Sequence, residues 1–206
     1  MKATLRPQLV ILGAGLDGRA WRLAELAGVD VFEVDRPASQ EDKRQRIGDL
    51  ELKAKSIRFV PVDFRGDSLG EALAAVGHDR AIPTTWICEG VIPYLTRIDV
   101  ESSVRAIAGC SAPGSRLVVN YQTPALSSTV GRMFASVVSK LSGGRNPMAQ
   151  ERWRSAWKPD EIEQLFARYG YAIVEDEDLL TIANRLSLDV KLRRYLQHGR
   201  VATTDR

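Results

Sequence analysis

The apolar positions of the chain form short continuous runs, and these runs alternate with segments whose apolar residues recur at helical spacing. Strands that are buried on both faces read as continuous apolar runs, so the pattern predicts parallel strands joined by helices. The expected strands are 9–12, 29–35, 57–62, 84–88, 116–121 and 171–175, and the expected helices are 20–27, 39–52, 68–76, 99–108 and 159–169. The alternation predicts an α/β protein with a doubly wound, mostly parallel sheet in a three-layer α/β/α arrangement.

Residues 123–158 do not follow this alternation. Their first part, 125–141, has the pattern of an amphipathic helix, and the glycine-containing stretch 142–146 interrupts it. We expect a substrate cap here, inserted in a single domain that covers residues 1–206, because this length suits one domain with a large core. A last, antiparallel strand is expected near 200–204.

Composition narrows the classes of protein. With 44% hydrophobic and 27% charged residues the chain is typical of a soluble globular protein. Its net charge of +3 comes without a basic block, and no apolar run is long enough for a membrane span, so neither nucleic acid nor membrane is an expected partner. Cys88 and Cys110 indicate a reduced, cytoplasmic location, and no Cys/His cluster suggests a metal. The sequence leaves open whether the protein forms a homo-oligomer.

A glycine-rich turn follows the first expected strand. Gly13 and Gly15 carry no Cβ, so a ligand can lie directly on their backbone and meet the N–H groups that follow. Asp35 ends the second expected strand, 20 residues after Gly15, where a carboxylate can accept hydrogen bonds from two ribose hydroxyls. The unit therefore predicts a site for a cofactor that contains adenosine. The spacing satisfies the dinucleotide fingerprint, but other nucleoside cofactors use similar turns.

Further polar residues follow the next strands. Asp63 and Glu89 come directly after the third and fourth expected strands, and Tyr121 ends the fifth. Because ligands of open α/β sheets bind beyond the carboxyl ends of the strands, these side chains are expected to surround one crevice with the glycine turn. Each acid also has a purely structural interpretation, such as a turn cap for Asp63, and Asp17 is expected to cap the first helix.

Four segments in order carry a resemblance to a known family. They are VILGAGLDGRAWRL, VFEVDRP with Lys43 behind it, FVPVDF and TTWICEGVIPYL. In this order they resemble the motifs of class I S-adenosylmethionine-dependent methyltransferases, and more narrowly the leucine carboxyl methyltransferase-like group that also contains polyketide O-methyltransferases. The resemblance covers most of residues 8–122 and, more loosely, 159–175. It implies the Rossmann-like methyltransferase fold and S-adenosyl-L-methionine as cofactor.

The resemblance also implies roles for individual residues. The cofactor site would comprise Gly13, Ala14, Gly15, Asp35, Arg36, Asp63, Phe64, Glu89 and Gly90. In it Asp35 binds the ribose hydroxyls, and Asp63 with Phe64 contacts the adenine. Glu89 faces the methionine amino group. Family members usually carry a helical segment ahead of the first strand, with a basic residue for the cofactor carboxylate, and we expect this segment to be missing here.

The expected activity is transfer of a methyl group to an oxygen of a small-molecule acceptor. A carboxylate acceptor is already an anion and needs no general base, whereas a hydroxyl needs one, and neither histidine is placed to serve. Tyr94 and Tyr121 are candidates for orienting the acceptor. Two alternatives are weighed against this hypothesis: an NAD(P)-dependent oxidoreductase, and a domain that binds a nucleoside cofactor without turnover.

Overall fold

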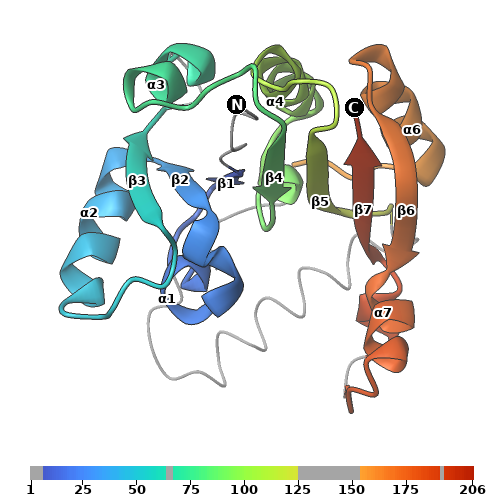
Figure 1. The fold of residues 1–206 in the computed structure, drawn as a ribbon. Coiled ribbons are helices and arrows are strands. Elements are labelled where there is room, and N and C mark those ends of the chain that lie inside the picture. The colour runs from blue at the N-terminus through green and yellow to red at the C-terminus, as the bar shows by residue number, and fades with distance from the viewer. Residues whose placement is uncertain (1–6, 64–66, 125–153, 191–192) are drawn as a thin grey trace.

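A seven-stranded sheet forms the centre of the structure, a computed structural model that describes residues 7–63, 67–124, 154–190 and 193–206 (Figure 1). The strands are β1 (Gln8–Leu12), β2 (Asp30–Asp35), β3 (Ser56–Pro61), β4 (Thr84–Cys88), β5 (Arg116–Gln122), β6 (Ala172–Asp178) and β7 (Gly199–Asp205). The helices are α1 (Arg19–Arg22), α2 (Pro37–Ile47), α3 (Leu69–Ala75), α4 (Arg97–Gly109), α6 (Pro159–Arg168), α7 (Leu179–Arg185) and α8 (Arg193–Leu196). Two 3-10 turns, η1 (Ala24–Gly28) and η2 (Ile92–Tyr94), complete the described elements.

The strands lie in the order β3-β2-β1-β4-β5-β7-β6. The first five are parallel, and β7 is antiparallel to both β5 and β6. This arrangement confirms the doubly wound, mostly parallel sheet and the last antiparallel strand that the sequence predicts. The direction of winding reverses between β1 and β4, which is the place where open α/β sheets bind their ligands.

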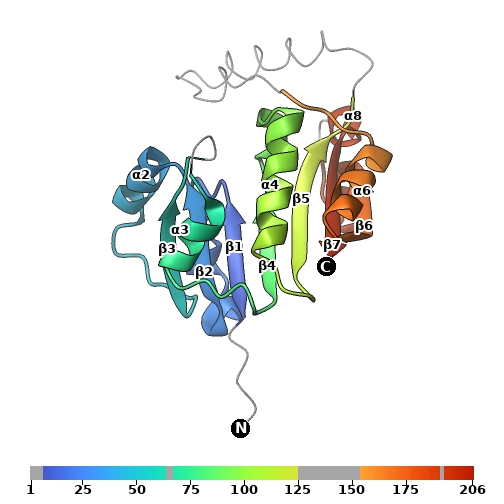
Figure 2. The same ribbon diagram turned by 90° about the horizontal axis from the view of Figure 1, so that it is seen from above.

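Apolar side chains cover both faces of the sheet. Along β1, Val10 and Leu12 join one buried cluster while Leu9 and Ile11 join another, because successive side chains of a strand point to opposite faces. The larger cluster receives side chains from α3, α4 and α6, which lie on one side of the sheet in Figure 2. The smaller cluster receives Ala20 of α1. Helices on both faces give the predicted three layers.

Two predicted helices differ from those in the structure. The helix expected over 20–27 is divided, because Leu23 is extended (φ −97°, ψ 109°) and a 3-10 turn follows it. The helix expected over 39–52 is α2, which ends at Ile47 because Gly48 has a φ of 52°. Both differences lie on surface segments, where apolar periodicity is a weak guide to the helix ends.

The segment after β6 contains structure that the sequence did not predict. β6 runs to Asp178, and the Asp178 side chain accepts a hydrogen bond from the Thr181 backbone N–H (2.9 Å) and so caps α7.

The predicted amphipathic helix at 125–141 lies outside the described residues. At 154–157 the end of the predicted cap lies beside η2 and β5, since Arg154 N donates to Pro93 O (2.7 Å) and Trp157 N to Gln122 O (2.8 Å). Every helix within the described ranges is too short or too polar to cross a lipid bilayer.

A buried ion pair joins β2 to α2 beneath the expected ribose site. Lys43 Nζ of α2 donates to Glu33 Oε2 of β2, and both side chains are almost completely buried. Gln40 Nε2 donates to the Glu33 backbone oxygen (2.8 Å) from the preceding turn of α2. Burial raises the pKa of Glu33 to about 7, although Lys43 offsets part of this effect. The pair fixes α2 to the strand that ends in Asp35.

This shift predicts a pH dependence of stability. Because the pKa of Glu33 rises from 4.5 to about 7 on folding, the folded protein holds more protons between these values, and its free energy of unfolding falls as pH rises through this window. The reference is the double variant Glu33→Gln/Lys43→Met, which lacks both charged side chains of the pair. From pH 5 to pH 8 the wild type is expected to lose roughly 2–3 kcal/mol relative to this variant in urea unfolding. Parallel stability curves for the two proteins would contradict the assignment.

Candidate functional site

The chain turns sharply after β1 and passes close to β2. Gly13 N and Ala14 N both donate to Val34 O of β2, at 2.8 and 3.2 Å, and Gly13 and Gly15 have φ values of 64° and 45°. Only glycine adopts this backbone region without strain. A Cβ on Gly13 would also overlap Val91 Cγ2, from the segment that follows β4. Glycine at position 13 thus lets the turn after β1 and the segment after β4 approach each other closely.

Asp35 at the end of β2 is held against the glycine turn. Its Oδ2 accepts a hydrogen bond from Gly15 N (2.7 Å) and its Oδ1 from Arg36 N (2.6 Å). The Asp35 side chain is partly exposed, and each carboxylate oxygen has a further lone pair. Two vicinal hydroxyls can therefore donate to the two oxygens without displacing either backbone contact.

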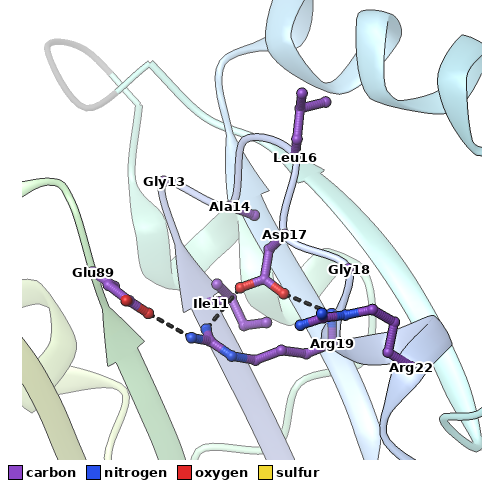
Figure 3. Close-up of a pocket in the computed structure, with 9 residues that line it drawn as sticks. All are labelled: Ile11, Gly13, Ala14, Leu16, Asp17, Gly18, Arg19, Arg22 and Glu89. Atoms are coloured by element: carbon purple, nitrogen blue, oxygen red, sulfur yellow. Dashed lines mark hydrogen bonds and ion pairs between the residues drawn. The ribbon is translucent and has the colours of Figure 1, made fainter. Parts of the chain in front are cut away.

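A cleft of about 570 Å³ opens between the glycine turn and the end of β4 (Figure 3). Its lining residues come from β1, the turn, α1 and the end of β4: Ile11, Gly13, Ala14, Leu16, Asp17, Gly18, Arg19, Arg22 and Glu89. Glu89 is the residue directly after β4, and its side chain is 61% exposed. The cleft thus lies at the β1/β4 switch point and joins two of the predicted strand-end sites, the glycine turn and Glu89.

The other predicted cofactor residues lie outside this lining. Asp63 is exposed after β3 and its N–H donates to Asp67 Oδ2 (2.8 Å). Phe64 is outside the described residues, and Arg36 is exposed at the start of α2. Gly90 N donates to Asn120 Oδ1 of β5 (2.7 Å). Asp35 nonetheless ends β2, and Asp63 lies two residues beyond the end of the neighbouring strand β3, so their expected roles toward ribose and adenine concern the same edge of the sheet.

The two candidate tyrosines differ in their surroundings. Tyr121 of β5 is fully buried, and its hydroxyl donates to Asp176 Oδ2 of β6 (2.6 Å). Burial and this contact raise the pKa of Tyr121 above its usual range. Tyr94 is partly exposed at the end of η2. Their part in orienting an acceptor stays a prediction.

Sequence reasoning missed Arg19 as a residue of the site. Arg19 Nη2 donates to Glu89 Oε2 (2.5 Å) and Nη1 donates to Asp17 Oδ2 (2.7 Å), so one guanidinium joins the glycine turn to the end of β4. Asp17 Oδ1 also accepts a hydrogen bond from Arg19 N, the first residue of α1 (2.7 Å), but the N-cap position of α1 is Gly18, so Asp17 lies one residue ahead of the cap that the sequence predicts. The sequence signal is the pattern Asp-x-Arg inside the glycine turn.

Neither histidine of the chain lines the cleft. His78 is buried near the amino end of β4, where its Nε2 shares a hydrogen bond with Thr84 Oγ1 (3.1 Å). His198 shares a longer contact with Thr123 Oγ1 (3.4 Å). Within the part of the chain that the structure describes, no three His, Cys, Asp or Glu side chains are grouped to hold a metal ion.

The fold and the switch-point site together define the class of protein. A doubly wound sheet with an antiparallel seventh strand between the fifth and sixth strands is the Rossmann-like fold of class I methyltransferases. A solved S-adenosylmethionine-dependent methyltransferase from Methanosarcina mazei shares this fold, with a TM-score of 0.63 at 13% identity over 97% of this chain and 92% of that one. The sequence profile of the leucine carboxyl methyltransferase family matches residues 3–108. The chain belongs to this family, which confirms the resemblance of its motifs.

Two bacterial relatives are similar over most of the chain. A protein of Mycolicibacterium paratuberculosis is 32% identical over 204 residues, which cover 90% of this chain and 66% of the relative. A protein of Streptomyces coelicolor is 47% identical over 166 residues, which cover 80% of this chain and 54% of the relative. Both bear the provisional name S-adenosyl-L-methionine-dependent methyltransferase. The chain thus spans between about half and two thirds of the length of these relatives.

Proposed function

We propose that this chain binds S-adenosyl-L-methionine at the β1/β4 edge of its sheet and transfers the methyl group to an oxygen of a small-molecule acceptor. The observation that carries the proposal is the cleft between the glycine turn and Glu89, with Asp35 hydrogen-bonded to the same turn. The relatives in the leucine carboxyl methyltransferase family support the choice of cofactor.

The residues present fit this cofactor. Gly13 lines the cleft without a side chain, Asp35 offers two acceptor oxygens for the ribose hydroxyls, and Glu89 offers a carboxylate for the methionyl ammonium. Such a charge-assisted hydrogen bond is stronger than a neutral one. When bound, the cofactor would supply a methyl group on a sulfonium centre.

The acceptor we favour is a carboxylate. A carboxylate is ionised at neutral pH and can attack without losing a proton, so the protein needs only to position it. A hydroxyl requires a general base, and the two histidines of the chain lie outside the cleft. Residues 123–158, which follow β5, are proposed to form part of the acceptor pocket.

Isothermal titration calorimetry with S-adenosylmethionine, and with NAD in parallel, tests the proposed cofactor. We expect micromolar binding of S-adenosylmethionine and none of NAD. Binding of NAD alone would overturn the proposal in favour of an oxidoreductase. Transfer of a labelled methyl group to a panel of carboxylic acids and phenols then tests turnover. Binding of the methyl donor without transfer to any of them would favour a cofactor-binding domain without turnover.

A further inference from the structure

The cluster Asp17–Arg19–Glu89 holds its arginine from two sides. Asp17 accepts from both the backbone N–H and Nη1 of Arg19, each at 2.7 Å, and so fixes the side chain at its root and at its tip. Nη2 of the same guanidinium reaches Glu89 at 2.5 Å (Figure 3). Two carboxylates, Asp17 of the glycine turn and Glu89 after β4, thus orient one guanidinium in the cleft.

The charges of this cluster remain accessible to a ligand. The exposed fractions of the three side chains are 14% for Asp17, 27% for Arg19 and 61% for Glu89. Burial lowers the pKa of Arg19, but the hydrogen bond to Glu89 and the charge of Asp17 outweigh it, so the pKa is raised and the side chain stays cationic. Glu89 can turn toward solvent or a ligand, whereas Asp17 is the less exposed, fixed partner.

An arginine and a glutamate side by side offer opposite charges at the spacing of an amino-acid zwitterion. The ammonium of such a group pairs with Glu89, and its carboxylate pairs with the guanidinium next to it. Arginine has five N–H donors, so Arg19 can keep its bond to Asp17 and still present a fork to a carboxylate. A zwitterion would replace one exposed ion pair by two.

We propose that Arg19 binds the carboxylate of the methionyl group and that Asp17 positions Arg19 for this task. This inference rests on the proposed function. Arg22 also lines the cleft and is the alternative cation, but the guanidinium that contacts Glu89, the partner expected for the ammonium, is that of Arg19. With Glu89 for the ammonium and Arg19 for the carboxylate, the cleft selects ligands that carry both groups of an amino acid.

The test compares two ligands that differ only in the carboxylate, S-adenosylmethionine and decarboxylated S-adenosylmethionine. In calorimetry with the full chain, Arg19→Ala is expected to weaken binding of S-adenosylmethionine roughly 10- to 100-fold, the range of a lost charged hydrogen bond. Binding of the decarboxylated ligand should change less than about twofold. Arg19→Lys, which keeps the charge but loses the fork, should give an intermediate loss for S-adenosylmethionine alone.

The matched control is Arg46→Ala, which removes an exposed arginine that pairs with Asp42 on α2 and should leave both affinities unchanged. The inference would be overturned if Arg19→Ala weakened binding of the two ligands equally. It would also be overturned if either ligand bound more tightly to Arg19→Ala, because Arg19 would then compete with the ligand's ammonium for Glu89. A carboxylate-specific loss in Arg22→Ala, without one in Arg19→Ala, would also overturn it. If the wild type binds neither ligand, the proposed function itself fails; if it binds both and Arg19→Ala changes nothing, only this inference fails.

Asp17→Asn measures the positioning role. It leaves the guanidinium in place but removes the charge that orients it, so we expect a smaller loss of S-adenosylmethionine affinity in the same direction and again no change for the decarboxylated ligand. Thermal unfolding of each variant checks that the fold persists. An Asp17→Asn protein that keeps the full discrimination between the two ligands would contradict the positioning role.

Discussion

Glu89→Ala is expected to lower the affinity for S-adenosylmethionine roughly 100-fold, because it removes the carboxylate that the cleft presents to an ammonium. The variant also releases Arg19 from its contact with Glu89. The side chain is 61% exposed, and such surface ion pairs contribute at most about 1 kcal/mol to stability, so the fold should be unaffected. Calorimetry and urea unfolding of the same preparation separate the two effects.

Two further variants sharpen this experiment. Glu89→Gln keeps a hydrogen-bond acceptor but not the charge, so its loss of affinity should be intermediate. Glu51→Ala is the matched control, because Glu51 is an exposed glutamate that pairs with Lys53 ahead of β3, and its affinity should equal that of the wild type. Near wild-type binding by Glu89→Ala would remove Glu89 from the proposed cofactor site.

Gly13→Ala is expected to destabilise the protein by about 2–5 kcal/mol. One part, about 1–2 kcal/mol, is the strain of an L-residue at a φ of 64°. The other, about 1–3 kcal/mol, is the overlap of the new Cβ with Val91 Cγ2. Urea unfolding at constant pH measures the sum.

Gly15→Ala provides the matched comparison for Gly13→Ala. Its φ is also positive, but the nearest atom to an added Cβ is Gly13 O at 3.9 Å, so this variant carries the strain without the overlap. The double variant Gly13→Ala/Val91→Ala, set against both single variants, should recover the overlap part alone. If Gly13→Ala and Gly15→Ala cost the same, Val91 does not constrain position 13.

The sequence was sufficient where a local pattern had one structural solution. The apolar run Leu9–Leu12 is a strand buried on both faces, and Thr84–Cys88 is β4 with the predicted bounds. Acids at the carboxyl ends of the predicted strands could be assigned to one edge of the sheet because parallel strands end at the same side. Asp35 and Glu89 accordingly lie at the ends of β2 and β4.

The parts that the sequence did not predict depend on contacts between distant residues or on backbone detail. Arg19 and Glu89 are 70 residues apart, and their ion pair exists only because β1 and β4 are neighbours in the sheet. Leu23 interrupts a segment whose apolar spacing is helical, and Gly48 ends α2 five residues before the polar, helix-favouring composition does. Apolar periodicity predicts which residues face a core, but it does not predict where a helix is interrupted or ends.

The place of β7 in the sheet has a consequence for the order in which the chain folds. In the described sheet β6 is hydrogen-bonded to β7 alone, and β7 pairs with β5 so that Arg116 meets Asp205. β6 is made before β7, yet it has no strand to join until residues 199–205 have closed the long loop back to β5. The two strands therefore assemble as one cooperative unit of high contact order, which we expect to form more slowly than the local β1–α1–β2 unit that carries the glycine turn.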